Sequence, residues 1–190
     1  MGQNFLEERL LLREVRLDDV ESYVRMLCDP VMMAELGGPL PRDRVEETVR
    51  RHVRENRSGA ALACLIVSEG DPMTVAGTVS AAERELDGEQ LAEIGWAVLP
   101  EFQGRGLATG AVRLLLARLR AERPWPSVHA FPGIANVPSN AVCRSTGFTL
   151  LGQREIEYAG RLLPANHWRF DLVAPGDAGG GSAQRMTRAH

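Results

Sequence analysis

The chain has 190 residues, and its 44% hydrophobic content is enough for one domain with a substantial core. The formal net charge is −3 and the 22 basic residues, all arginine, form no block, so we expect no nucleic-acid partner. No apolar run is long enough to span a membrane and no secretory signal precedes the first strand, so we expect a cytoplasmic protein without a membrane partner. The three cysteines, Cys28, Cys64 and Cys143, have neither disulfide nor metal-ligand spacing, so we expect no metal.

The first half of the chain alternates between strand and helix patterns. Runs of apolar residues bounded by turn residues predict strands, and apolar residues at every third or fourth position among charges predict helices. These patterns predict strands over Leu10–Arg16, Ala61–Ser68 and Thr74–Ala82, helices over Leu17–Cys28 and Arg42–Asn56, and an irregular segment over residues 31–40.

The second half continues the alternation and ends in a polar tail. The same patterns predict strands over Glu89–Leu99, Val128–Phe131, Thr149–Ile156 and His167–Val173, with helices over Leu107–Arg120 and Val137–Thr146. The Gly-rich segment from Ala174 onward is typical of disordered chain. This element order indicates a mixed sheet covered by helices.

A glycine-rich loop joins the strand that ends near Leu99 to the Leu/Arg helix that follows. The loop reads Gln103-Gly104-Arg105-Gly106-Leu107-Ala108. Glycine lets the backbone approach a ligand closely, and the first amides of a helix have no intrahelical partner. Together with the positive end of the helix dipole, these amides favour a phosphate group.

Two motifs in this half of the chain resemble those of the GNAT superfamily of acyl-CoA-dependent N-acetyltransferases. The superfamily's cofactor loop has the pattern Q/R-x-x-G-x-G/A, which Gln103, Gly106 and Ala108 match. Its later helix begins N-x-x-S/A and ends in G-F. Asn136, Ser139, Gly147 and Phe148 match that second pattern. The opening segment, residues 10–19, resembles the subgroup of ribosomal-protein N-terminal acetyltransferases, the RimJ/RimL-like enzymes.

The resemblance implies a fold and a domain division. The expected fold is α/β (α+β): a mixed, mostly antiparallel sheet of six or seven strands, splayed at the cofactor site and flanked by about four helices. The domain would span residues 9–173, after a lead-in over residues 1–8 and before a disordered tail over residues 174–190.

The resemblance also implies acetyl-CoA as acyl donor and a set of residues that bind it. Backbone groups of the strand end would pair with the pantetheine arm, the loop and helix start would hold the diphosphate, and Asn136 would contact the arm. The expected cofactor residues are Ala97, Val98, Leu99, Gln103, Gly104, Arg105, Gly106, Leu107, Ala108, Thr109, Gly110 and Asn136.

Two side chains are candidates for catalysis by direct acyl transfer. Glu93 matches the glutamate base of related enzymes, although it could instead hold an arginine or face solvent. Ser139 could give a proton to the departing thiolate, or serve only the first turn of its helix. Cys143 occupies the position where related enzymes carry a tyrosine acid, and we do not expect it to act as a nucleophile because nothing cationic activates it.

The acceptor is predicted only as a class: a primary amine, on a small molecule or at a protein N-terminus. Residues that could line its pocket are Glu35, Trp96, Tyr158 and His167, and His129 could relay a proton. The aromatic residues and His129 could equally belong to the sheet and its core. A non-catalytic acyl-CoA-binding or regulatory module is the alternative function, and a homodimer is expected from the family alone.

Overall fold

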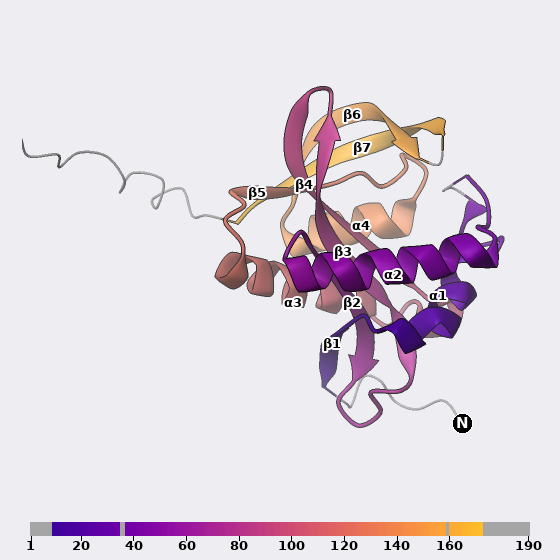
Figure 1. The fold of residues 1–190 in the computed structure, drawn as a ribbon. Helices are drawn as coiled ribbons and strands as arrows, with labels where there is room; N and C mark the ends of the chain where they lie inside the picture. Colours follow the sequence, from indigo (N-terminus) through magenta and orange to yellow (C-terminus); the bar gives the residue numbers. More distant parts are fainter. Residues whose placement is uncertain (1–8, 35–36, 159, 173–190) are drawn as a thin grey trace, which may run out of the picture.

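The fold is built on one seven-stranded sheet. The computed structural model describes residues 9–34, 37–158 and 160–172. Within them the strand order is β1-β2-β3-β4-β5-β7-β6 (Figure 1). Every neighbouring pair is antiparallel except β4 and β5, which are parallel. The strands are β1 Leu10–Glu14, β2 Ala61–Ser68, β3 Val75–Leu86, β4 Glu89–Val98, β5 Ser127–Ala130, β6 Thr149–Tyr158 and β7 Arg161–Asp171.

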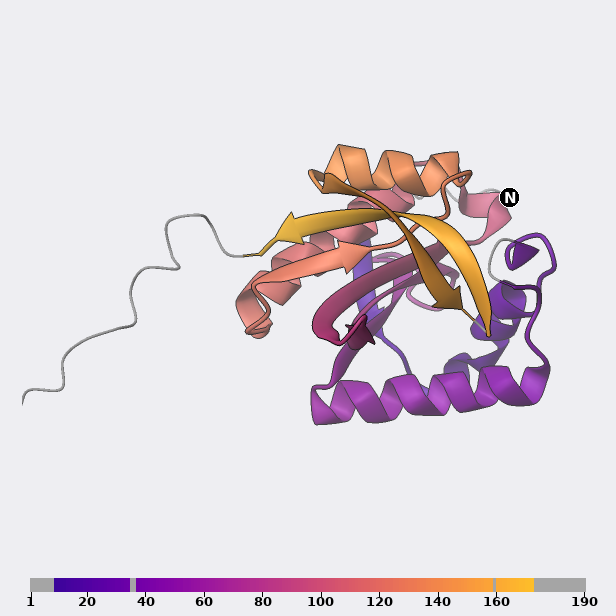
Figure 2. The same ribbon diagram turned by 90° about the horizontal axis from the view of Figure 1, so that it is seen from above.

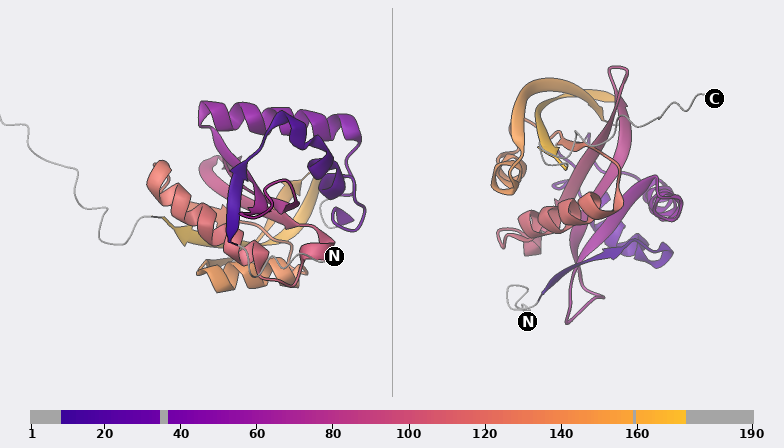
Figure 3. Two further views of the ribbon diagram at one scale, coloured as in Figure 1. Left: turned by 90° about the horizontal axis from the view of Figure 1, so that it is seen from below. Right: turned by 90° about the vertical axis from the view of Figure 1, so that its left-hand side faces the viewer.

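Helices cover both faces of the sheet, as Figures 2 and 3 show from several sides. The helices are α1 Val20–Leu27, α2 Arg42–Ser58, α3 Leu107–Glu122 and α4 Val137–Thr146. Helices α1 and α2 lie on one side, which we name the α1–α2 face, and α3 and α4 lie on the other, the α3–α4 face. The expected mixed, mostly antiparallel sheet with four flanking helices is thereby confirmed.

The sheet separates two apolar cores because its side chains alternate between the faces. On the α3–α4 face, Ile94 and Val128 pack with Leu115 of α3. On the α1–α2 face, Leu65 packs with Val49 of α2. Both surfaces of β2 are buried, which explains why its sequence reads as one continuous apolar run. Among the residues that the structure describes, no helix is both long and apolar enough to cross a membrane.

Two hairpins are longer than their sequences predict. Strand β3 runs to Leu86 instead of Ala82 and reverses at Asp87-Gly88, whose φ values of 52° and 80° suit a two-residue hairpin turn. Strand β7 begins at Arg161 instead of His167. The added part of β3 carries charged residues on both faces, so it lacks the one-sided alternation that marks a half-buried strand, and the added part of β7 contains Pro164, which argues against a strand in the sequence.

The first predicted helix is also divided. A 3₁₀ turn over Leu17–Asp19 precedes α1, and Asp19 lies at the junction. Its carboxylate accepts from the Arg16 N–H at 2.7 Å and from the Arg13 guanidinium at 2.8 Å. The segments predicted as a lead-in and a tail, residues 1–8 and 174–190, lie outside the described residues.

Candidate functional site

The sheet opens between β4 and β5. The two strands are paired only at Ala92 with Val128 and at Glu93 with His129. Beyond that point β4 continues to Val98 while β5 ends at Ala130, and the described residues show no further pair between them (Figure 1). One edge of β4, along Ile94–Val98, is therefore left without a strand partner at the centre of the sheet.

Backbone directions decide which residues can pair across this opening. The Leu99 N–H donates to the Ala76 carbonyl at 2.9 Å, so it points toward β3 and away from the opening. The Leu99 N–H is thus already paired within the sheet, and the pairing of this residue with the cofactor stays a prediction. Because successive backbone groups of a strand point in opposite directions, the Val98 N–H points into the opening. The Val98 carbonyl accepts from Gln103 Nε2 at 2.9 Å.

A close backbone approach holds this open edge in place. Gly77 of β3 is paired with Val98, and a Cβ at Gly77 would overlap the backbone of Ala97. Only glycine fits here, because any side chain would push β3 away from β4. The position gives no local signal in the sequence, since it lies inside an ordinary strand pattern.

The loop before α3 has the open geometry that its glycines predict. We name residues 103–110, the loop and the first turn of α3, the cradle. Gly104 and Gly106 have φ values of 72° and 74°, and Gly106 is the N-cap of α3. A Cβ on either residue would meet no atom within 4 Å, so the space beside the loop is open. The first turn of α3 carries no acidic residue, and its unpaired amides face this space with the positive end of the helix dipole. The cradle therefore fits a phosphate group.

Other residues of the predicted cofactor set have structural contacts of their own. Gly110 packs closely on β1, because a Cβ there would come within 2.8 Å of Leu10 Cδ2. Thr109 Oγ1 lies 3.3 Å from Ser145 Oγ and so connects α3 to α4. Arg105 donates to the Glu101 carbonyl at 3.0 Å. Leu107 and Ala108 pack on the α3–α4 core.

Helix α4 begins beside the same opening. The Asn136 carboxamide oxygen accepts from the Ser139 N–H at 3.0 Å, so Asn136 is the helix cap. Ser139 is partly exposed in this first turn. Cys143 is fully buried, and burial raises the pKa of its thiol to about 12, which argues against a nucleophilic thiolate.

Sequence reasoning missed Asn140, which ties α4 to the sheet. Its side-chain amide donates to the carbonyls of Gly133 and Asn136 at 2.9 and 2.8 Å. Its oxygen accepts from Asn166 Nδ2 at 2.8 Å and from Trp168 Nε1 at 2.9 Å. Every hydrogen-bonding position of this buried amide is thus filled. An asparagine on a helix gives no sequence signal for such a role.

Glu93 lies on the opposite face of the opening. Its neighbours Ala92 and Ile94 pack in the α3–α4 core, so the alternation of the strand directs Glu93 to the α1–α2 face. Its carboxylate accepts from Arg84 Nη1 at 2.6 Å, and both side chains are about three-quarters buried, with 29% and 25% exposure. Arg84 also donates to the Glu157 carbonyl at 2.9 Å.

Three predicted acceptor residues have different positions. The pKa of Tyr158 is raised, mainly by desolvation and further by the charge of Glu93. Trp96 packs against the α3–α4 core, on the face of β4 opposite to Glu93. Glu35 lies outside the described residues.

The fourth predicted acceptor residue, His167, is buried and pairs with His129. His129 Nδ1 lies 2.7 Å from His167 Nε2, and Ser127 Oγ lies 3.2 Å from His129 Nε2. Desolvation lowers the pKa of both imidazoles, to about 4 for His167. The sequence predicted His167 as an acceptor-pocket residue and His129 as a proton relay, but it did not predict that the two side chains are in contact.

The comparisons with known proteins agree with this geometry. The model of the acetyltransferase (GNAT) domain matches residues 9–149, about three-quarters of the chain. The chain belongs to the GNAT acetyltransferase family. The predicted recognition is confirmed, and the GNAT protein is by its family an N-acetyltransferase. No curated protein matches it significantly.

Several solved structures share the whole fold of this GNAT protein. One is the Salmonella typhimurium acetyltransferase that modifies the N-terminal serine of ribosomal protein L7/L12, at TM-score 0.72 and 20% identity over 88% of this chain and 97% of that one. Another is RimL, the ribosomal L7/L12 α-N-protein acetyltransferase, with coenzyme A, at TM-score 0.71 and 21% identity over 85% and 93%. A third is Vibrio cholerae spermidine N-acetyltransferase with CoA and spermine, at TM-score 0.70 and 18% identity over 86% and 95%.

Proposed function

We propose that this GNAT enzyme transfers an acetyl group from acetyl-CoA to a primary amine by direct attack in a ternary complex. The observation that carries the proposal is the opening between β4 and β5, where pairing stops after Glu93 and His129. It connects the cradle on the α3–α4 face with the polar side chains on the α1–α2 face. A donor held on one face can thus meet an acceptor that arrives from the other.

The donor side is formed mainly by backbone. The diphosphate of acetyl-CoA fits the amides of residues 104–108, because Gly104 and Gly106 leave their space open. The pantetheine arm would lie along the open edge of β4, where the Val98 N–H can also donate to the thioester oxygen as charge develops on it. The bound thioester supplies a good leaving group, so the protein mainly positions the reactants.

The acceptor side is formed by side chains. Glu93 would take a proton from the amine, directly or through water, and the Arg84 ion pair would hold its carboxylate in place. Ser139 or solvent would protonate the departing thiolate. The acceptor class rests on the relatives, which acetylate a protein N-terminal serine in one case and are named for spermidine in another. We propose a primary amine of either kind.

Binding and turnover test the proposal separately. Calorimetry should detect acetyl-CoA and desulfo-CoA, since the cradle recognises the diphosphate. Thiol release should then be measured with a panel that contains spermidine, a small monoamine and peptides that begin with serine or alanine. Turnover with one of these amines is the expected result. Absence of acetyl-CoA binding contradicts the proposal, and tight binding without turnover on any amine favours a non-catalytic acyl-CoA-binding module.

A further inference from the structure

Three side chains form a hydrogen-bonded line at the point where the sheet opens. Ser127 and His129 lie two residues apart on β5, on the same face of the strand, and His167 lies on β7. The line runs from Ser127 Oγ to His129 Nε2 at 3.2 Å and from His129 Nδ1 to His167 Nε2 at 2.7 Å. His129 uses both ring nitrogens in the line and His167 uses one, so the three groups can pass a proton in sequence.

The line lies on the same face as Glu93. Val128 and Ala130 pack in the α3–α4 core, so the alternation of β5 places Ser127 and His129 on the α1–α2 face. His129 is also the residue paired with Glu93 in the last step of the β4–β5 ladder. The line therefore begins where the donor and acceptor of the proposed reaction would meet.

His167 lies at the opening and Ser127 lies away from it. The β5–β7 ladder ends with Ala130 opposite Trp168, so His167 is one step beyond the end of β5. The ring of Phe131 packs on His167 with centroids 4.7 Å apart and limits its exposure to 8%. His167 Nδ1 has no hydrogen-bond partner among the residues that the structure describes. Ser127, at the other end, is partly exposed at the start of β5.

The proposed reaction requires an exit for one proton. A primary ammonium loses two protons when it becomes an amide, and the departing thiolate can take up one of them. The other must reach solvent. Glu93 can serve one deprotonation, but its carboxylate is already paired with Arg84. A second acceptor with a route to water is therefore needed on this face.

We propose that His167 accepts the proton that the ammonium loses before attack and that His129 and Ser127 carry it to solvent. His167 Nδ1 gains that proton, and the Nε2 proton of His167 moves to His129 Nδ1. The Nε2 proton of His129 then moves to Ser127 Oγ, and the hydroxyl proton of Ser127 passes to water. Each residue in the line gains one proton and loses one, and the amine is left neutral for attack. The two imidazoles end with their protons on Nδ1 and return to the Nε2 form before the next turnover. This inference rests on the proposed function.

The electrostatics of the line are consistent with this role. Desolvation is the main cause that lowers the pKa of both histidines, so both are neutral near pH 7 and able to accept. Arg154 lowers the pKa of both histidines further, Arg169 lowers that of His129, and Asp171 opposes this effect at His129. Repulsion between the two imidazoles adds to the effect at His167. A proton would therefore not remain on the pair, as a relay requires.

Kinetics of variants test the relay with the acceptor that the amine panel identifies. His167→Ala should lower kcat about 30-fold with acetyl-CoA affinity unchanged, since a positioned base contributes at least this much. Added imidazole should restore at least a third of the lost rate. Ser127→Ala should lower kcat only about threefold, because water can replace the hydroxyl. The matched control is His52→Gln, at a histidine that bonds to Tyr23 Oη at 2.8 Å outside the line. An unchanged kcat in His167→Ala, or a loss that imidazole does not restore, overturns the proposal.

Nitrogen-15 NMR of histidine-labelled protein tests the line without any acceptor. The proposed direction requires the resting protein to carry its proton on Nε2 of both His129 and His167, with both Nδ1 atoms as acceptors. A proton on His129 Nδ1 reverses the line and overturns the proposal. These outcomes are separable from the proposed function. Lack of turnover in the wild type contradicts the acetyl transfer, whereas normal turnover with the wrong tautomer contradicts only the relay.

Discussion

The two faces of the opening are built in different ways. On the α3–α4 face, the cradle consists of backbone from one short segment, residues 103–110, with two glycines at positive φ. On the α1–α2 face, the candidate groups are side chains from five strands, among them Arg84 of β3, Glu93 of β4 and His167 of β7. A site made of backbone from one short segment can be recognised in the sequence as a motif. A site made of side chains from several strands cannot, because only the folded sheet brings those side chains together.

The largest effect is expected at Asn140, which ties α4 to the sheet. Asn140→Ala removes four hydrogen bonds and leaves the Trp168 N–H and the Asn166 amide without their acceptor. Buried polar groups left unpaired cost roughly 1–3 kcal/mol each, so the free energy of unfolding should fall by about 4 kcal/mol. Urea denaturation measures this loss. Asn166→Ala, which removes the 2.8 Å bond to Asn140, is the control and should cost about 1 kcal/mol. Equal losses in the two variants would show that the other three hydrogen bonds of Asn140 do not stabilise the fold.

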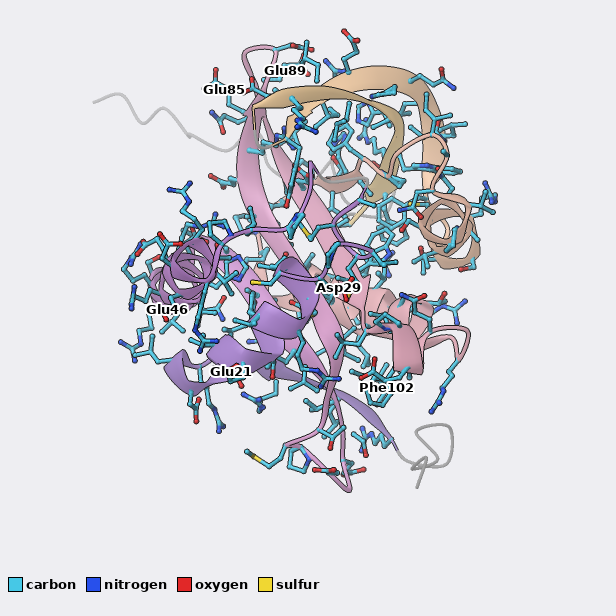
Figure 4. The ribbon with its side chains drawn as sticks, turned by 90° about the vertical axis from the view of Figure 1, so that its right-hand side faces the viewer. Glu21, Asp29, Glu46, Glu85, Glu89 and Phe102 are labelled. Atoms are coloured by element: carbon cyan, nitrogen blue, oxygen red, sulfur yellow. The ribbon has the colours of Figure 1, made fainter. Side chains whose placement is uncertain are left out.

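A substitution on the α1–α2 face should lower kcat without changing the affinity for acetyl-CoA. Glu93→Gln keeps the size of the side chain and a hydrogen bond to Arg84, but an amide cannot take a proton. We expect kcat to fall about 100-fold while the Kd for acetyl-CoA stays within about twofold. The control is Glu89→Gln at the exposed start of the same strand, labelled at the tip of the β3–β4 hairpin in Figure 4. If the pH–rate profile of Glu93→Gln matches that of the wild type, Glu93 is not a base.

A substitution on the α3–α4 face should weaken acetyl-CoA binding without changing kcat at saturation. Gly106→Ala places a methyl group in the open space of the cradle, where the diphosphate would lie. We expect the Kd for acetyl-CoA to rise about 30-fold, equivalent to about 2 kcal/mol, with kcat at saturation little changed. Gly88→Ala is a matched control, because Gly88 has a φ of 80° and equally open space but belongs to the β3–β4 turn. Calorimetry that shows the same loss in both variants would attribute the effect to backbone strain.

The sequence alone predicts the fold well because its signals are local. The continuous apolar run of Ala61–Ser68 and the spacing of Val45, Val49 and Val53 locate β2 and α2. The first part of β7, residues 161–166, was missed because Pro164 interrupts the strand pattern and only Ala165 among these residues is buried.

The candidate site also has a part that the sequence predicts and a part that it does not. The cradle around Gly106 was predicted because glycine, loop and helix start follow one another in the chain. The role of Gly77, the network of Asn140 and the contact of His129 with His167 were not predicted. Each of them depends on a partner 20 or more residues away, and no local pattern carries that information.

The last prediction concerns stability, because pH acts on the histidines of one face only. All three histidines of the described chain, His52, His129 and His167, lie on the α1–α2 face, and burial lowers the pKa of His52 and His167 from 6.5 to about 4. The unfolded chain binds these protons near pH 6.5 and the folded protein does not, so stability is present above pH 6.5 and is lost as pH falls toward 4.

Between pH 7 and pH 5 we therefore expect the free energy of unfolding to fall by about 3.5 kcal/mol and Tm by about 10 °C. This window lies above the ordinary pKa values of the carboxylates at Glu21 and Asp71, whose shifts act only below it. Differential scanning calorimetry at both pH values measures the change. His52→Gln should remove about half of the pH dependence, since it removes one of the two strongly shifted imidazoles. A Tm that is the same at pH 7 and pH 5 would mean that the imidazoles are hydrated in the folded protein, and the buried histidine line would lose its electrostatic basis.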